Sequence, residues 1–233
     1  MKLVTFAGPP SSGKTSVILQ CLRAMDLPPE KVGVVKFDCL TSFDYLRYQQ
    51  AGCQVVTGYS GKTCPDHFFV SNIEDGIRWG LASGFDWLFT ESAGLCNRCS
   101  PYLNGIPAVC VIDDLSGVNT PRKIGPMLKF ADVVAVTKGD VVSQAEREVF
   151  TFNIRQINAT AKILGVNGIT GQGSFMLAKY LRTAPDVATL QDRKLRFPMP
   201  AAVCSYCTGE TRIGEAYQLG TLRKMDFKEA CRV

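Results

Sequence analysis

The sequence predicts an α/β fold, with a mainly parallel sheet, helices on both of its faces and a small cysteine-containing C-terminal appendage. Three observations lead to this prediction. Short apolar runs alternate with stretches of helical periodicity, a glycine-rich loop follows the first run, and several other runs end in polar or acidic residues. Short, fully apolar strands are typical of parallel sheets covered by helices, and such sheets bind ligands at the carboxyl ends of their strands.

The predicted elements follow one another in regular order until the last fifth of the chain. The apolar runs predicted to be strands are residues 3–6, 32–37, 54–57, 87–90, 108–112, 133–136 and 162–165. Helices are predicted from residue 16 onward and over residues 43–51, 69–82, 121–130, 143–157 and 175–181. The pattern weakens near residue 184, so we expect one domain over 1–183 and a cysteine-containing extension over 184–233.

Composition and charge exclude several classes of protein. The chain has 233 residues and a net charge of +5, which suits an anionic ligand. The sequence has no basic run and no basic–aromatic stripe, which are the features typical of nucleic-acid binding. No apolar stretch approaches the length of a membrane span, and the N-terminal apolar run is too short for a signal peptide. We therefore expect a cytoplasmic protein that acts without a membrane or nucleic acid.

The glycine-rich loop matches a phosphate-binding motif. Residues 8–15 have the spacing G-x-x-x-x-G-K-[ST] between a predicted strand and a predicted helix. In this P-loop motif, backbone N–H groups surround phosphate oxygens, the lysine reaches the β- and γ-phosphates, and the last hydroxyl ligates Mg²⁺. The sheet is thus expected to be of the P-loop nucleotide-binding type. The candidate nucleotide ligands here are Gly8, Ser11, Ser12, Gly13, Lys14, Thr15 and Ser16.

A second motif points to the base of the nucleotide. Thr137, Lys138 and Asp140 follow a late apolar run in the pattern [NT]-K-x-D. A carboxylate at the last position can accept from both N1–H and the 2-amino group of guanine, whereas adenine offers no matching pair of donors. The loop that begins at Asn167 is expected to close over the base edge with its backbone N–H groups.

Two acidic residues at strand ends are candidates for the hydrolytic step. Asp38 and Glu91 follow the second and fourth predicted strands, and both can hold Mg²⁺ or orient the attacking water. We favour Asp38 as the magnesium ligand beside Thr15. The candidate catalytic residues are Lys14, Asp38 and Glu91.

Five of the ten cysteines, together with the only histidine, form candidate metal ligands. Cys64 and His67 are three residues apart, which suits one Ni²⁺ or Zn²⁺ ion. Two C-x-x-C pairs, Cys96 with Cys99 and Cys204 with Cys207, can form the halves of one four-thiolate site for zinc or an iron–sulfur cluster. A bound metal or cluster as cargo, a structural zinc ion and a redox pair all remain open at this point.

Taken together, these motifs resemble the nickel-insertion GTPases of hydrogenase maturation and the related urease accessory GTPases. The resemblance covers roughly residues 1–183 and rests on five stretches of sequence. They are residues 8–16, the polar positions between 38 and 52, Gly61-Lys62-x-Cys64, residues 91–94 and residues 137–140. Two departures are visible: Thr137 replaces the more usual asparagine, and Asp66 is inserted between Cys64-Pro65 and His67.

The resemblance implies GTP hydrolysis coupled to homodimerisation, with residues 38–64 responding to the γ-phosphate. It also implies that Cys64 and His67 bind metal at a dimer interface, and that Cys99, which precedes a Ser-Pro, contacts the metal as well. The function expected is a GTPase that delivers a metal or metal cluster to a client enzyme. An iron–sulfur or zinc module that uses nucleotide as a conformational ligand, and a P-loop kinase of a small molecule, are the alternatives.

Overall fold

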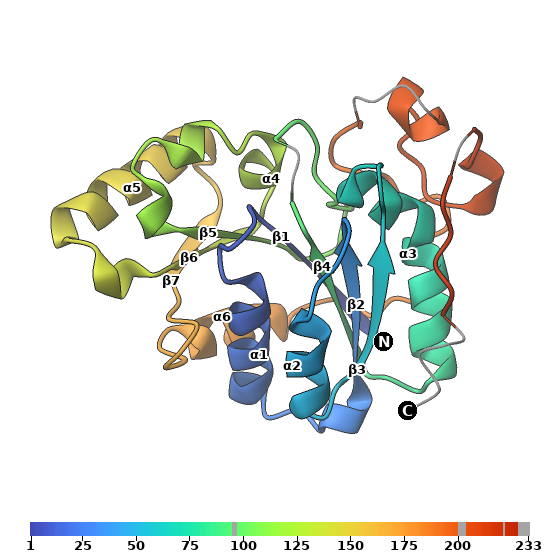
Figure 1. The fold of residues 1–233 in the computed structure, drawn as a ribbon, viewed down its shortest axis with the longest axis horizontal. Coiled ribbons are helices and arrows are strands. Elements are labelled where there is room, and N and C mark those ends of the chain that lie inside the picture. The colour runs from blue at the N-terminus through green and yellow to red at the C-terminus, as the bar shows by residue number, and fades with distance from the viewer. Residues whose placement is uncertain (95–96, 200–203, 221, 228–233) are drawn as a thin grey trace.

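The computed structural model describes residues 1–94, 97–199, 204–220 and 222–227, and its centre is one seven-stranded sheet (Figure 1). The strands lie in the order β3-β2-β4-β1-β5-β6-β7, and every neighbouring pair is parallel. The predicted α/β fold class is confirmed, and each predicted strand is present. Their bounds are β1 (Lys2–Ala7), β2 (Val32–Asp38), β3 (Gln54–Tyr59), β4 (Trp87–Ser92), β5 (Ala108–Asp113), β6 (Val133–Thr137) and β7 (Lys162–Gly165).

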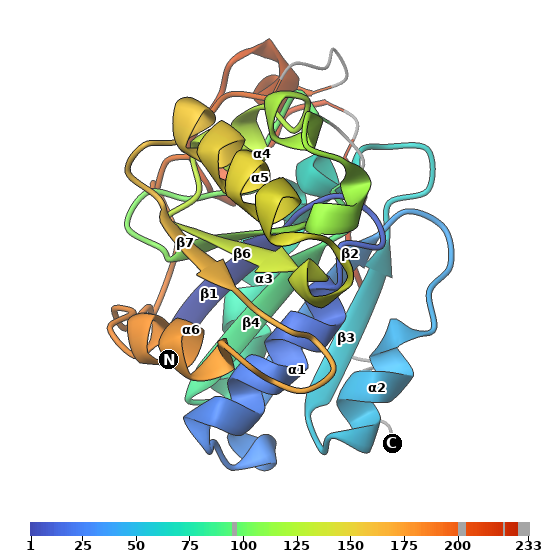
Figure 2. The same cartoon turned by 90° about the vertical axis from the view of Figure 1, so that its left-hand side faces the viewer.

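Helices cover both faces of the sheet (Figure 2). One face packs against α1 (Lys14–Met25) and α6 (Ser174–Leu181), with α2 (Asp44–Gln50) beside α1. The other face packs against α3 (Pro65–Ala82), the short α4 (Pro126–Lys129) and α5 (Gln144–Ile157). Successive strand side chains alternate between the faces, so Phe89 of β4 joins the α1 core and Leu88 joins the α3 core.

Two helices differ from the sequence prediction. The helix predicted over residues 121–130 is instead a 3₁₀ turn (Thr120–Arg122) followed by α4. Gly125 separates the two with a φ of 64°, a left-handed conformation that interrupts the right-handed helix. Helix α3 begins four residues earlier than predicted, because Pro65 occupies its first position, where a missing N–H group costs nothing.

The C-terminal extension packs against α3 and shares a hydrophobic core with it. Leu190, Tyr206 and Ile213 of the extension are buried in one cluster with Ile73 and Ile77 of α3. The extension, orange to red in Figure 1, lies along this helix. The domain boundary at residues 183 and 184 stays a prediction, but the apolar side chains on either side of it are buried together. No helix in the described part of the chain is long and apolar enough to cross a bilayer.

Candidate functional site

The loop between β1 and α1 has a backbone that only glycine allows at two positions. A Cβ atom at Gly8 would lie 2.0 Å from the carbonyl oxygen of Val111, and the φ of Gly8 is 153°. Gly13 caps the N-terminus of α1 with a φ of 89°. The loop therefore passes close to β5 and leads directly into α1, whose N-terminal N–H groups can receive a phosphate.

Lys14 spans the mouth of this loop. Its Nζ donates to the carbonyl oxygens of Gly8 at 3.0 Å and Pro9 at 2.8 Å. Burial lowers the pKa of Lys14, and the carboxylate of Glu91 opposes that effect. A buried ammonium group that is hydrogen-bonded only to neutral carbonyl oxygens is strongly stabilised by an anionic partner. The residues present therefore fit a nucleotide polyphosphate.

Glu91, at the end of β4, is the centre of a buried polar cluster. Its carboxylate accepts from Thr15 Oγ1 at 3.0 Å, from Lys36 Nζ at 3.0 Å and from Tyr48 OH at 2.6 Å. Burial followed by the negative charge of Glu91 raises the pKa of Tyr48 well above its usual value. The cluster fixes the P-loop threonine to the strand end, which is where a magnesium ion bound by Thr15 would lie.

Asp38 lies beside this cluster and is linked to it by a lysine. Lys36 Nζ lies 3.3 Å from Asp38 Oδ2 and 3.3 Å from Asp44 Oδ2. Burial alone would lower the pKa of Lys36, but the carboxylates of Glu91 and Asp38 outweigh it and raise that pKa. A cavity of about 390 Å³ opens over these groups, lined among others by Ser11, Lys14, Thr15, Asp38, Arg47 and Glu91.

The second predicted motif lies against the P-loop. Thr137 Oγ1 donates to the carbonyl oxygen of Ser12 at 2.7 Å, and Lys138 Nζ donates to that of Ser11 at 2.8 Å. Lys138 adopts a left-handed backbone with a φ of 58°. A separate cavity of about 500 Å³ adjoins this turn, and Asp140 and Asn167 are among its lining residues. Phosphate-binding and base-binding candidates are thus held together by direct hydrogen bonds.

The loop after β7 is held together by hydrogen bonds of its own. Asn167 Oδ1 accepts from the N–H groups of Ile169 at 2.8 Å and Thr170 at 2.9 Å, and the N–H of Gly171 donates to the carbonyl of Asn167. These three backbone N–H groups are therefore already bonded within the loop, and the contact of the loop with a base edge stays a prediction. Asn167 shapes the loop beside the cavity, a role that its side-chain acceptor suits.

A first group of metal-ligand side chains combines the start of α3 with the loop after β4, and we call it the Cys64 group. It consists of Cys64, Asp66 and Cys99. The two sulfur atoms lie 3.7 Å apart, and Cys99 Sγ lies 3.3 Å from Asp66 Oδ2. Hydrogen bonding to Cys99 lowers the pKa of Cys64, while burial raises the pKa of Asp66. A thiolate is the metal-binding form of cysteine, so a lowered pKa favours metal binding.

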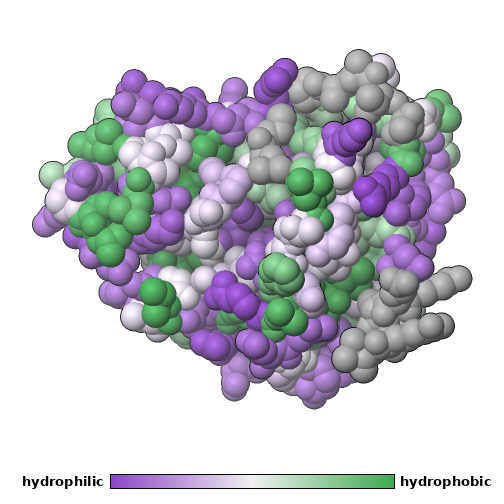
Figure 3. Space-filling model, viewed as in Figure 1, coloured by the Kyte–Doolittle hydropathy of each residue, from purple (hydrophilic) through white to green (hydrophobic). Residues whose placement is uncertain are grey.

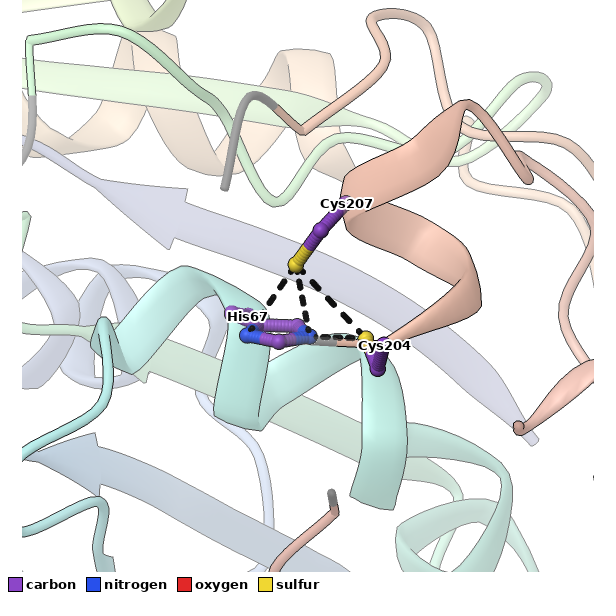
Figure 4. A group of neighbouring side chains, drawn as sticks. All are labelled: His67, Cys204 and Cys207. Carbon is purple, nitrogen blue, oxygen red and sulfur yellow. Dashed lines mark hydrogen bonds between the residues drawn. The ribbon is translucent and has the colours of Figure 1, made fainter. Parts of the chain in front are cut away.

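A second group joins α3 to the C-terminal extension, and we call it the His67 group. It consists of His67, Cys204 and Cys207, and its ligand atoms all lie within 4.8 Å of one another (Figure 4). His67 points from the first turn of α3 toward the two sulfur atoms of the extension. Burial lowers the pKa of His67, which favours the neutral imidazole that metals bind.

These two groups correct the ligand sets expected from the sequence. Cys64 and His67 belong to different groups, because Cys64 is the N-cap of α3 and has an extended backbone, whereas His67 lies within the helix. Cys99 meets Cys64 rather than Cys204 and Cys207, so the two C-x-x-C pairs do not form one site among the described residues. Cys96 lies outside the described residues, and its predicted metal role stays a prediction.

Two side chains of the polar cluster were missed by the sequence prediction. Lys36 is a single charged residue within the apolar run of β2, and a buried lysine there needs a carboxylate partner. That pattern could have identified it. Tyr48 lies on α2, where nothing in the local sequence indicates a contact with Glu91, 43 residues away.

Comparison with known proteins identifies the family. Residues 2–165 match the family described as CobW/HypB/UreG, nucleotide-binding domain. The chain belongs to this family. The match spans the whole sheet from β1 to β7, and the resemblance drawn from the motifs is confirmed.

Individual relatives show how far the likeness extends. An uncharacterized protein of Methanocaldococcus jannaschii is 45% identical over 226 residues, which are 97% of each chain. The hydrogenase maturation factor HypB from Archaeoglobus fulgidus has a TM-score of 0.60 at 22% identity and covers 77% of this chain and 89% of its own. HypB from Helicobacter pylori, in complex with nickel, has a TM-score of 0.61 at 20% identity, with 78% and 86% covered. At these identities the solved structures support the fold alone.

Proposed function

We propose that this protein is a GTP-hydrolysing maturation factor that couples the state of its nucleotide to the binding and delivery of a divalent metal. Family membership supports nucleotide binding and a metal-handling role at the general level. The choice of GTP, the residues that act and the coupling to a metal are the proposal. They are supported by the arrangement of the nucleotide pocket and the Cys64 group around the end of β4.

The pocket residues divide the work of binding and hydrolysis between them. Lys14 and the P-loop backbone hold the phosphates, while Thr15 and Asp38 hold magnesium, directly or through water. Glu91 keeps Thr15 in place and orients the attacking water. The carboxylate of Asp140 selects guanine by accepting from the N1–H and the 2-amino group of the base. When bound, GTP and magnesium supply the scissile phosphoanhydride and the charge that stabilises its cleavage.

One chain of contacts supports the coupling, and it passes through two consecutive residues of β4. Glu91 points to the α1 face and accepts from Thr15, and Ser92 points to the α3 face and donates to Asp66. Asp66 in turn accepts from Cys99 Sγ at 3.3 Å. A change in the contacts of Glu91 when the γ-phosphate leaves would therefore displace Ser92 and alter the Cys64 group.

The Cys64 group has ligands that suit a cargo metal. Two sulfurs and one carboxylate favour borderline divalent ions such as Ni²⁺ or Zn²⁺ over magnesium or calcium. Three ligands leave at least one coordination position, which a client or a second copy of the chain can fill. We propose nickel as the cargo, a choice suggested by the nickel bound to the Helicobacter pylori neighbour.

A homodimer and a client metalloenzyme are the proposed partners. Leu40 and Phe43, beside the nucleotide pocket, are 70% and 76% exposed, which suits a contact that forms with the nucleotide. On the face drawn in Figure 3, hydrophobic side chains are scattered in small groups between hydrophilic ones. Cys64, Cys204 and Cys207 are free thiols, which suits a reducing compartment such as the cytoplasm.

Two measurements on the purified protein test the proposal. GTP hydrolysis is followed by phosphate release without any acceptor, and nickel affinity is measured with GDP and with a non-hydrolysable GTP analogue. We expect magnesium-dependent hydrolysis of GTP in preference to ATP and at least a five-fold difference between the nickel affinities, a coupling of about 1 kcal/mol. Absence of GTP binding, or equal nickel affinities, would refute the coupled function.

A further inference from the structure

The His67 group lies outside the machinery proposed above. Residues 2–165 make up the matched family domain, and Cys204 and Cys207 belong to the C-terminal extension beyond it. The group therefore joins the family domain to a segment that the family match does not include. His67 is separated from Cys204 by 137 residues and from Cys207 by 140, so only the folded chain brings the three together.

Two of the three distances within the group match those around a tetrahedral ion. Bonds of about 2.3 Å to sulfur and 2.0–2.1 Å to nitrogen place ligand atoms about 3.5–3.8 Å apart. Cys204 Sγ and Cys207 Sγ are 3.7 Å apart, and Cys207 Sγ lies 3.6 Å from His67 Nε2. The third pair, His67 Nε2 and Cys204 Sγ, is 2.5 Å apart and must separate by about 1 Å, a small side-chain movement.

The site has the donors of a zinc-class ion rather than of a cluster. One imidazole nitrogen and two thiolates are borderline-soft ligands that suit Zn²⁺ and its spectroscopic substitute Co²⁺. Iron–sulfur clusters usually take four protein ligands, most of them thiolates, whereas this group supplies two thiolates. Cys204 is 6% exposed and His67 is 5% exposed, so both ligands are already positioned by packing and lose little freedom on binding.

Closing this group would fasten an extension that continues along α3 to β3. Further along the extension, Asn72 of α3 donates to the carbonyl of Arg223 at 3.0 Å and accepts from the N–H of Met225 at 2.8 Å. A Cβ atom at Gly58, near the end of β3, would lie 2.5 Å from Met225 Sδ. The extension thus reaches from the His67 group to the end of β3.

We propose that His67, Cys204 and Cys207 form a second metal site, which binds one zinc-class divalent cation through these three ligands and fastens the C-terminal extension to α3. Binding releases the two thiol protons, because the ligands are thiolates, and leaves the oxidation state of the sulfurs unchanged. The site is structural, whereas the Cys64 group is proposed to carry cargo. This inference does not depend on GTP binding or hydrolysis.

The test is a Co²⁺ titration of the reduced, full-length protein, with bound metal counted by equilibrium dialysis and thiolate ligation observed by charge-transfer absorption. Wild type is expected to bind two ions, and Cys207→Ser and Cys64→Ser one each. Cys39→Ser is the matched control, because Cys39 belongs to neither group, and it should bind two. Unchanged stoichiometry and absorption in Cys207→Ser would overturn the proposal.

Thiol footprinting of the wild type gives a second measurement that needs no variant. Zn²⁺ is added to the reduced protein, and alkylation by iodoacetamide is followed at each cysteine by mass spectrometry. Cys204 and Cys207 should be protected at least ten-fold, with or without GDP, while Cys39 reacts equally in both conditions. Equal alkylation with and without zinc, a Cys204–Cys207 disulfide in protein isolated without oxygen, or bound iron and sulfide would each overturn the proposal.

Discussion

Both metal-ligand groups use the first turn of α3, yet their connections to the rest of the protein differ. Asp66 and His67 are neighbours in sequence, but Asp66 faces Ser92 of β4 and His67 faces the C-terminal extension. The Cys64 group is therefore linked to the P-loop residue Thr15 through two consecutive residues of β4, Glu91 and Ser92. The His67 group is joined to a segment that lies beyond the matched family domain.

This difference is why we propose a releasable ion for the Cys64 group and a permanent one for the His67 group. A site attached to the strand that carries Glu91 can respond to the nucleotide. The His67 group joins the extension to α3. The apolar side chains buried at the same contact, such as Tyr206 and Ile213, stabilise the packing of the extension on this helix. Substitutions that change one group and leave the other unchanged test this difference.

Replacing the P-loop lysine should have the largest effect and should act on the Cys64 group alone. Lys14→Ala is expected to weaken GTP binding about 100-fold or more, because two charge-assisted hydrogen bonds of about 1.5–3 kcal/mol each are lost. Calorimetric titration measures this, with Lys31→Ala at the opposite end of β2 as the control. Zinc binding by the His67 group should not change, and a parallel loss there would contradict the separation of the two groups.

Cutting the link between β4 and α3 should uncouple nucleotide from metal. Ser92→Ala removes the hydroxyl that donates to Asp66, so the difference in nickel affinity between the GDP and GTP-analogue states should fall from at least five-fold to within two-fold. GTP affinity should change less than about three-fold, since Glu91 still holds Thr15.

Thr90→Val is the matched control for this experiment. Thr90 lies two residues earlier on β4, on the same face as Ser92 and equally buried, and its hydroxyl donates to Val4 rather than to a metal ligand. The valine variant should keep the full coupling. Coupling that persists in Ser92→Ala would refute the proposed path, and loss in both variants would indicate a general disturbance of the strand.

Base selection should be separable from both metal groups. Asp140→Asn is expected to lower GTP affinity about ten-fold and leave ATP affinity unchanged, because a neutral acceptor replaces the charged one. Competition with a fluorescent nucleotide measures this, and Glu148→Gln removes a similar charge from the exposed side of α5 as the control. Equal discrimination between GTP and ATP before and after the change would remove Asp140 from the base site.

A surface contact of the extension should contribute least. Lys224 Nζ lies 3.0 Å from Asp75 Oδ2 and donates to the carbonyl oxygen of Ser71 at 2.7 Å, and both charged side chains are partly exposed. Lys224→Ala should therefore reduce the free energy of unfolding by only about 0.2–1 kcal/mol, measured by urea denaturation against Lys179→Ala. A loss well above this range would mean that ion pairs, rather than buried apolar side chains and the His67 group, hold the extension.

The strands of the sheet could be predicted from the sequence because a local pattern of residues marks each of them. Each strand is a short apolar run, and the P-loop has a fixed spacing between its glycines and Lys14. The helix over residues 121–130 was wrong because a periodic pattern does not reveal the left-handed conformation of Gly125. The individual roles of the site residues stay predictions.

The two metal groups could not be predicted because their members are brought together only by the fold. Cys64 meets Cys99 across 35 residues, and each cysteine has another plausible partner nearer in sequence. His67 seemed to belong with Cys64 because the two share a loop in the sequence. In the structure Cys64 is the N-cap of α3 and His67 lies in its first turn. The segments that pack beside each residue, and not their separation in sequence, determine which ligands each one meets.

Of the two groups, we propose that only the Cys64 group responds to the nucleotide. The most direct test measures metal affinity with GDP and with a non-hydrolysable GTP analogue in two variants, each of which retains one group. In Cys207→Ser, which retains the Cys64 group, nickel affinity should differ at least five-fold between the two nucleotides. In Cys64→Ser, which retains the His67 group, zinc affinity should be the same with both. Equal affinities in Cys207→Ser, or a nucleotide-dependent affinity in Cys64→Ser, would contradict the account.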